Sequence, residues 1–134
     1  MGTIKNFEDL EVWCKARLLC KEIYEVTLKG SFAKDYSLKN QILDSSGSIM
    51  DNIAEGFERE GVKEFIQFLS IAKGSVGETR SQLYRVFDRN HIEKEIFEKL
   101  FSDAIQISKM LSGFINYLKN SELKGSKYKV NLRT

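Results

Sequence analysis

The chain has 134 residues, of which 42% are hydrophobic, enough for one domain with a single modest core. Proline is absent, which favours long helices joined by short connections. No apolar run approaches the roughly 20 residues that span a bilayer, so no membrane partner is expected. Residues 1–5 lack the apolar core of a signal peptide, and the cytoplasm is therefore the expected location.

The positive charge of the chain is concentrated near its end. Residues 1–120 carry 17 Lys and Arg against 18 Asp and Glu. Residues 121–134 contain one acidic residue and four basic ones, which are Lys124, Lys127, Lys129 and Arg133. Because this segment has no hydrophobic periodicity, we expect residues 1–120 to fold and residues 121–134 to form a basic, disordered tail. A balanced body with a basic tail is a weak electrostatic signature of nucleic-acid binding.

The first predicted helix runs from about residue 8 to residue 29, because apolar side chains recur there at alternating steps of four and three. The members of this stripe are Val12, Ala16, Leu19, Ile23 and Val26. The two cysteines, Cys14 and Cys20, point to different faces of this helix. We expect buried or half-buried free thiols that neither form a disulfide nor chelate a metal together.

Ser37 is the expected N-cap residue of a second helix, which continues to a turn at Gly61. Gly56 leaves the end of its apolar face without a side chain. That face consists of Leu38, Ile42, Ser45, Ser46, Ile49 and Ile53. Because two serines form its middle, a neighbouring helix can approach closely there if the hydroxyls find hydrogen-bond partners.

The third helix is predicted from about residue 62 to residue 89. Its apolar stripe is Phe65, Phe68, Leu69, Ala72, Val76, Leu83 and Phe87. Gly74 and Gly77 lie in mid-helix at a cost of roughly 1 kcal/mol each relative to alanine, which suggests that something approaches this helix closely. Gly77 shares a second line with Ile66 and Tyr84, which we predict to contact another subunit.

After a short turn at residues 90–91, a fourth helix is predicted from about residue 93 to residue 118. Its seam is Phe97, Phe101, Ala104, Ser108, Leu111, Ile115 and Leu118, with Leu100, Ile107 and Phe114 beside it. This apolar surface is broader than one neighbouring helix covers, so we expect burial on two sides. The predicted fold is all-α, an antiparallel up-down-up-down four-helix bundle.

Two continuous polar lines run along the second and third predicted helices. They are Gln41, Ser48, Asn52, Glu55 and Arg59 on the second, and Ser75, Glu78 and Gln82 on the third. We expect Glu55 to bond Asn52, Ser75 or Arg59. Three interpretations remain open: a hydrogen-bonded network that sets helix register, a polar groove or subunit-lined pore that binds a ligand or RNA, and ordinary solvent exposure.

The chain offers little that would support catalysis. Glu55 and Glu78 on facing helices resemble the carboxylates of diiron bundles, but those bundles need a Glu-x-x-His pair on each of two helices. The only histidine is His91, which is expected in a turn. Neither a Ser/His/Asp set, nor a phosphate-binding loop, nor a CxxC pair is found. We therefore expect no metal, no cofactor and no enzymatic activity.

Basic residues make the C-terminal half of the third helix positive. They are Lys73, Arg80, Arg85 and Arg89. Their favourable interaction with the helix dipole is one explanation, and contact with phosphate groups is the other. Direct binding of RNA or DNA would use these residues together with the basic tail.

Four ordered segments of this sequence resemble a known family of helical bundles. The segments are Phe7-x-x-Leu10-x-Val12-Trp13, Tyr36-x-Leu38-x-x-Gln41-Ile42, Ser48-Ile49-x-x-Asn52-Ile53-Ala54-Glu55-Gly56 and Phe65-x-x-Phe68-Leu69-x-Ile71-Ala72-x-Gly74-Ser75-x-x-Glu78. The family is named for proteins encoded in intervening sequences of bacterial 23S ribosomal RNA genes, and the resemblance covers about residues 7–118.

The resemblance implies an up-down bundle that assembles as a homopentamer and has no established enzymatic activity. A related branch includes the accessory protein of diversity-generating retroelements, which associates with a reverse transcriptase and nucleic acid. In this chain Leu43 and Asp44 replace basic residues usual in the family, which argues against RNA binding through the second helix. The expected function is a non-catalytic, self-associating scaffold, with an RNA- or DNA-binding accessory protein as the alternative.

Overall fold

The computed structural model describes residues 3–123, which form four long helices joined by short connections. The long helices are α1 (Glu11–Thr27), α2 (Tyr36–Glu58), α3 (Val62–Asp88) and α4 (Lys94–Leu123). Two short 3-10 helices precede α1 and α2, namely η1 (Phe7–Asp9) and η2 (Gly30–Lys34). Strands are absent from the described residues, so the predicted all-α fold is confirmed.

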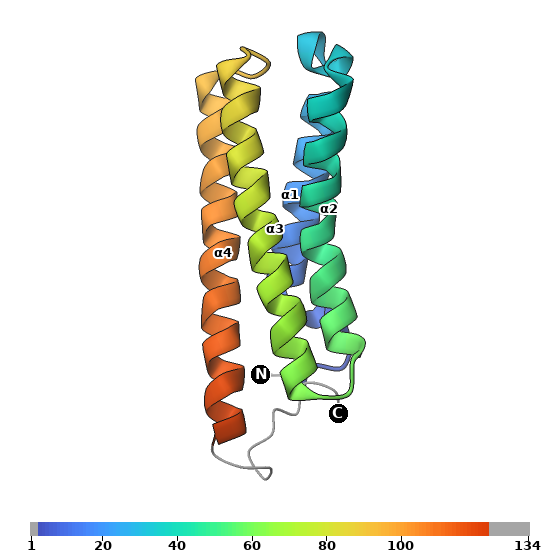
Figure 1. The fold of residues 1–134 in the computed structure, drawn as a ribbon, viewed down its shortest axis with the longest axis vertical. Helices are drawn as coiled ribbons and strands as arrows, with labels where there is room; N and C mark the ends of the chain where they lie inside the picture. The colour runs from blue at the N-terminus through green and yellow to red at the C-terminus, as the bar shows by residue number, and fades with distance from the viewer. Residues whose placement is uncertain (1–2, 124–134) are drawn as a thin grey trace.

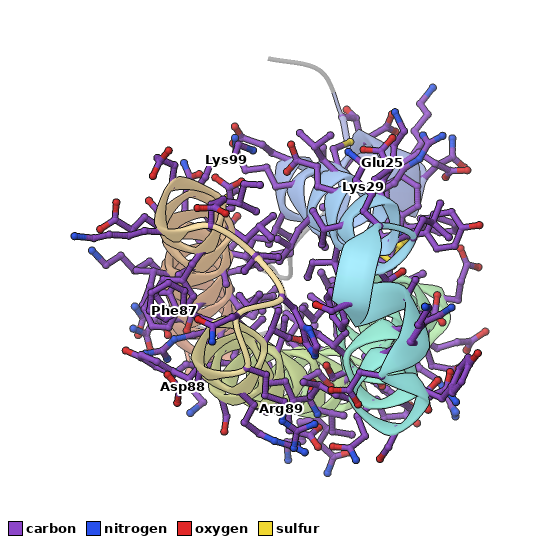
Figure 2. All side chains as sticks on the ribbon, turned by 90° about the horizontal axis from the view of Figure 1, so that it is seen from above. Glu25, Lys29, Phe87, Asp88, Arg89 and Lys99 are labelled. Carbon is purple, nitrogen blue, oxygen red and sulfur yellow. The ribbon has the colours of Figure 1, made fainter. Side chains whose placement is uncertain are left out.

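The four helices form an up-down-up-down bundle. The connections lie at alternate ends of the molecule, so each helix runs opposite to the one before it (Figure 1). Each helix packs on its sequence neighbours, and α1 also packs on α4. Seen along its axis, the bundle is four-sided and encloses one core (Figure 2). No helix within residues 3–123 has the length and apolar character needed to cross a membrane.

Most residues of the predicted apolar stripes point into this core, but Phe68 and Phe87 of the α3 stripe are only half-buried. The whole predicted face of α2 is buried, including both serines in its middle: Leu38, Ile42, Ser45, Ser46, Ile49 and Ile53. Burial of these stripes supplies most of the stabilisation of a bundle, because the helix propensity of each segment alone is marginal.

Several details at the helix ends differ from the sequence-based expectations. The N-cap residue of α2 is Asp35, whose carboxylate accepts a hydrogen bond of 3.4 Å from the Leu38 N–H. The prediction of Ser37 is therefore wrong, and the Ser37 hydroxyl accepts instead from the Gln41 side chain. The helix begins earlier because an aspartate precedes its first turn and is a strong capping group. At the other end of the chain, α4 continues past its predicted end to Leu123.

The two thiols have different surroundings. Cys20 is half-buried, as expected, but Cys14 is exposed, so the expectation is wrong for that residue. The helix α1 begins only at Glu11, and the Cys14 thiol donates a hydrogen bond of 3.3 Å to the Glu8 carbonyl in η1.

The closest contact between α2 and α3 lies at Gly56, near the turn that joins them. A Cβ atom at this position would stand 2.7 Å from the Phe68 Cβ and 3.3 Å from the Phe65 carbonyl oxygen. Neither atom can move without the α3 backbone. Gly56 therefore sets the distance between the two helices at this end of the bundle.

We expect Gly56→Ala to lower the free energy of unfolding by about 1–3 kcal/mol, because the added methyl group overpacks a contact made by backbone-anchored atoms. Gly47→Ala is the matched control, since Gly47 is also inside α2 and a Cβ there would meet no atom of the described residues within 4 Å. The control should gain roughly 0.5–1 kcal/mol. Urea unfolding at fixed protein concentration measures both, and equal effects would contradict the close contact.

Candidate functional site

Side-chain hydroxyls join α2 to α3 along the middle of their contact. Ser75 Oγ donates to Ser48 Oγ at 3.0 Å, and Ser45 Oγ lies 2.9 Å from Thr79 Oγ1. Ser45 Oγ also donates to Gln82 Oε1 at 2.5 Å. We call these five residues the polar seam. Ser45, Ser75 and Thr79 are buried.

The helix backbone supplies further hydrogen-bond partners to the seam. Thr79 Oγ1 donates to the Ser75 carbonyl at 2.9 Å, and Asn52 Nδ2 donates to both the carbonyl and the hydroxyl of Ser48 at 2.8 Å. Among the residues that the structure describes, the one buried side-chain polar atom without a partner is Arg80 Nε. Each buried hydroxyl of the seam therefore has at least one partner, and such a network favours one register of α2 against α3.

The outer members of the predicted polar lines belong to the surface. Arg59 donates to Glu55 at 3.0 Å, lies 3.7 Å from Glu64 and places its guanidinium 4.9 Å from the centre of the Phe68 ring. Of the three partners expected for Glu55, the contact found is with Arg59. Both side chains of this pair are about half exposed, so its contribution to stability is small.

An open groove of about 470 Å³ lies over the polar seam. Its lining is Gln41, Asp44, Ser45, Ser48, Glu78 and Gln82. Within residues 3–121 no ion pair involves Asp44 or Glu78. Arg85 lies beside the groove and donates to Gln41 Oε1 at 2.8 Å. The groove is therefore polar and acidic. The described residues hold no group of three or more His, Cys, Asp or Glu side chains arranged to bind a metal ion.

The four basic residues of α3 that are candidates for phosphate contact do not all lie on one surface. Arg80 lies on the α4 side, with its guanidinium 5.1 Å from the centre of the Phe101 ring. Arg89 extends from the other side of the end of α3 (Figure 2) and pairs with Asp35 at 2.8 Å. Arg85 also bonds to α2, through Gln41. The four basic positions of the tail, Lys124, Lys127, Lys129 and Arg133, lie outside the described residues.

A second groove, of about 630 Å³, lies between α3 and α4. It is lined by Ser70, Lys73, Gly74, Ser112, Ile115, Asn116 and Lys119, and none of these residues is acidic. Lys73 and Lys119 are exposed. The surface between α3 and α4 is thus basic, whereas the surface between α2 and α3 is acidic.

The line predicted to contact another subunit lies partly against α4. Ile66 is half-buried, and Tyr84 is 51% exposed with its ring centroid 5.1 Å from that of Phe101. Gly77 is exposed, and a Cβ at this position or at Gly74 would find no neighbour among the described residues within 4 Å. The two glycines therefore serve no close contact within the protomer.

A cluster of polar residues closes the end of the bundle where η2 meets the turn after α3. The His91 ring donates from Nε2 to Asp35 at 2.8 Å, and its Nδ1 lies at hydrogen-bond distance from the Ser31 hydroxyl, also at 2.8 Å. Phe32 stacks on the imidazole with a centroid distance of 5.1 Å and an interplanar angle of 1°. Arg89 binds the same carboxylate oxygen of Asp35. The expectation that the chain has no Ser/His/Asp set is thus wrong.

The surroundings of Asp35 indicate what this set does. Hydrogen bonds from His91 and Arg89, and the backbone bond from Leu38, lower the pKa of Asp35 from 3.8 to about 2. One carboxylate thus caps α2 and holds the turn between α3 and α4 against the α1–α2 connection. Three groups donate hydrogen bonds to the Asp35 carboxylate: His91, Arg89 and the Leu38 N–H. In a hydrolase the corresponding carboxylate serves to orient the catalytic histidine. The cluster therefore works as a latch between two connections of the bundle.

The fold and these clusters define a class of protein: an all-helical four-helix bundle with a polar seam between α2 and α3. The chain matches the model of the 23S rRNA-intervening sequence protein family over residues 8–113, and it belongs to this family. It is similar to a crystal structure from Bacteroides thetaiotaomicron, a protein with unknown function from the S23 ribosomal protein family. The two are 28% identical with a TM-score of 0.71, over 78% of this chain and 97% of that chain. No curated protein matches the sequence.

We expect Thr79→Val to lower the free energy of unfolding by about 1–3 kcal/mol, because a buried hydroxyl of Ser45 loses a partner. The double variant Ser45→Ala/Thr79→Val should cost less than the sum of the two single variants, by about 0.5–3 kcal/mol. Chemical unfolding of all four proteins of this cycle at one protomer concentration gives the coupling. Strict additivity would show that the two hydroxyls act independently.

The depressed pKa of Asp35 predicts a loss of stability in acid. A carboxyl group whose pKa is lower in the folded chain contributes fully above its ordinary pKa, and this contribution disappears as the pH falls from about 4 to about 2. Thermal unfolding of Asp35→Asn should therefore depend less on pH over this interval than unfolding of the wild type. Glu98→Gln changes the charge equally at an exposed position and should behave as the wild type. Parallel pH profiles for all three proteins would contradict the latch.

Proposed function

We propose that this protein is a non-catalytic, cytoplasmic scaffold that associates with copies of itself, as a homopentamer. The exposed glycines of α3 carry the proposal. Two glycines inside one helix cost roughly 2 kcal/mol together relative to alanine, and the protomer gains no close contact from either. A helix of another protomer can approach closely where the backbone carries no side chain, and this contact would offset the cost of the glycines. The number of copies is that implied by the family resemblance.

Exposed apolar side chains support self-association. Among the described residues, seven of them are more than half exposed and lie on the long helices or just after them: Leu18, Tyr24, Leu28, Tyr36, Ile71, Tyr84 and Tyr117. Ile71 and Tyr84 belong to α3 itself, on either side of its glycines. Singly exposed apolar residues are common on monomers, so these residues support the proposal only together with the glycines.

The absence of catalysis is proposed from how the polar side chains are engaged. The hydroxyls of the polar seam bond one another and the helix backbone. In the latch, Asp35 is shared by His91, Arg89 and the Leu38 N–H, which ties it to the ends of the helices. Side chains committed in this way hold the fold and are poor candidates for chemistry on a substrate.

Direct binding of RNA or DNA, as an accessory protein of a nucleoprotein complex or a reverse transcriptase, is the second candidate. One observation favours it: Lys73 and Lys119 line an open groove without an acidic neighbour in that lining. Phosphate contacts account for most non-specific affinity, and each contact adds about −0.9 to the slope of log K against log salt for duplex DNA. Two such lysines predict a slope of only about −1.8.

We expect light scattering at micromolar concentration to give a mass of several protomers for the wild type. Gly77→Leu should shift the protein towards the protomer mass with unchanged helix content, because the new side chain lies on an exposed position of α3. Glu25→Leu, which places a leucine on an exposed position of α1, should leave the mass unchanged. A wild type that remains a protomer would refute the proposed function.

A further inference from the structure

Two adjoining faces of the bundle carry opposite charge. The first, which we call the acidic face, consists of Asp44 and Asp51 on α2 and Glu78 on α3. The two aspartates are seven residues apart and therefore lie on one side of their helix. All three carboxylates are exposed, and none has an ion pair within residues 3–121. Asp44 and Glu78 line the groove over the polar seam.

The second, which we call the basic face, lies between α3 and α4. It consists of Lys73, Arg80, Lys109 and Lys119. Lys73 and Lys119 line the groove there, and Lys109 shares a side of α4 with two other lining residues, three and seven positions further on. The three lysines are exposed and have no ion pair among the described residues. Arg80 is half-buried over Phe101.

We propose that the acidic face of one copy docks on the basic face of the next copy. This inference rests on the proposed self-association and names the surfaces that make it. The two faces involve the same stretch of α3, because Glu78 lies between Lys73 and Arg80 in sequence. Opposite charges therefore meet at the same level of two bundles set side by side. Each protomer uses two different surfaces, so the contact is heterologous and continues from copy to copy.

The angle between the faces determines how such an assembly closes. Neighbouring sides of a four-sided bundle point about 90° apart, and this bundle is four-sided (Figure 2). Parallel bundles joined through two neighbouring sides return to the starting copy after roughly four or five steps, which makes a closed ring. The helix shared by both sides, α3, then faces the ring axis.

This arrangement explains the glycines of α3 that make no close contact within the protomer. Between residues 70 and 81 the outward line of α3 consists of four small residues, Ser70, Gly74, Gly77 and Ser81, and all four are exposed. In the ring this line faces the axis, where the α3 helices of all copies converge. Small side chains permit that convergence, and a leucine at Gly77 would obstruct it.

Charge reversal tests the pairing of the faces. The basic-face variant is Lys73→Glu/Lys109→Glu/Lys119→Glu, and the acidic-face variant is Asp44→Lys/Asp51→Lys/Glu78→Lys. We expect each to fall to the protomer mass in light scattering at about 0.1 M salt, because like charges then face each other. A six-fold variant that combines both sets should recover the wild-type mass. Lys21→Glu/Lys29→Glu/Lys34→Glu carries the same charge change on exposed residues of the α1 side and should assemble normally.

Circular dichroism establishes that each variant is folded, and a salt series on the wild type provides a measurement free of mutation. Raising the salt from about 0.1 to 1 M shortens the screening length from about 10 to 3 Å, so the dissociation constant of the assembly should rise at least tenfold. Assembly that does not respond to salt would overturn the inference.

The remaining outcomes separate the inference from the proposed function. A protomeric wild type refutes both. A wild-type assembly that survives either triple reversal, or a six-fold variant that stays protomeric, overturns the pairing of the faces and leaves self-association standing. A basic-face variant that keeps its mass but loses retention of RNA on a filter would assign this face to nucleic acid and overturn the inference.

Discussion

The structure depends on the close contact of α2 and α3. Two features of the sequence permit it: a glycine at one end, where α3 leaves no space for a methyl group, and hydroxyl side chains in the middle, which replace large apolar groups. Burying hydroxyls between helices is costly unless each is paired. Here Ser45, Ser48, Ser75 and Thr79 pair with one another, so the same groups that let the helices approach also define their register.

The surfaces on the two sides of α3 differ in charge. An open groove lies on each side of α3, and charged side chains line both grooves. Carboxylates collect on the α2 side and lysines on the α4 side. Glycines that are unnecessary within the protomer occupy the helix between these two grooves. The charge on both sides of α3 and the exposed backbone at its glycines are the reasons for proposing that copies meet through this helix.

The latch shows why part of the site was beyond sequence analysis. Ser31 and His91 are 60 positions apart in the sequence, and Asp35 and His91 are 56 apart. No local pattern relates them, because their meeting follows from the antiparallel return of the chain. The capping role of Asp35 was open to prediction, since an aspartate directly before a helix is a strong N-cap. Thr79 was also absent from the predicted polar lines. It follows Ser75 by one helical turn, but only its contact with α2 identifies it as a buried residue.

The amino-acid sequence by itself determined the number of helices, their approximate ends, their buried faces and the family. These properties follow from local periodicity and from the spacing of glycines and serines. Both can be recognised without knowledge of the tertiary structure. The tertiary structure alone decided which hydroxyls pair, that Arg80 and Arg89 lie on opposite sides of α3, and that Glu55 pairs with Arg59. The physical reason is that pairing depends on the register and rotation of one helix against another. Small shifts in either exchange one partner for another, while the pattern of buried and exposed positions stays the same.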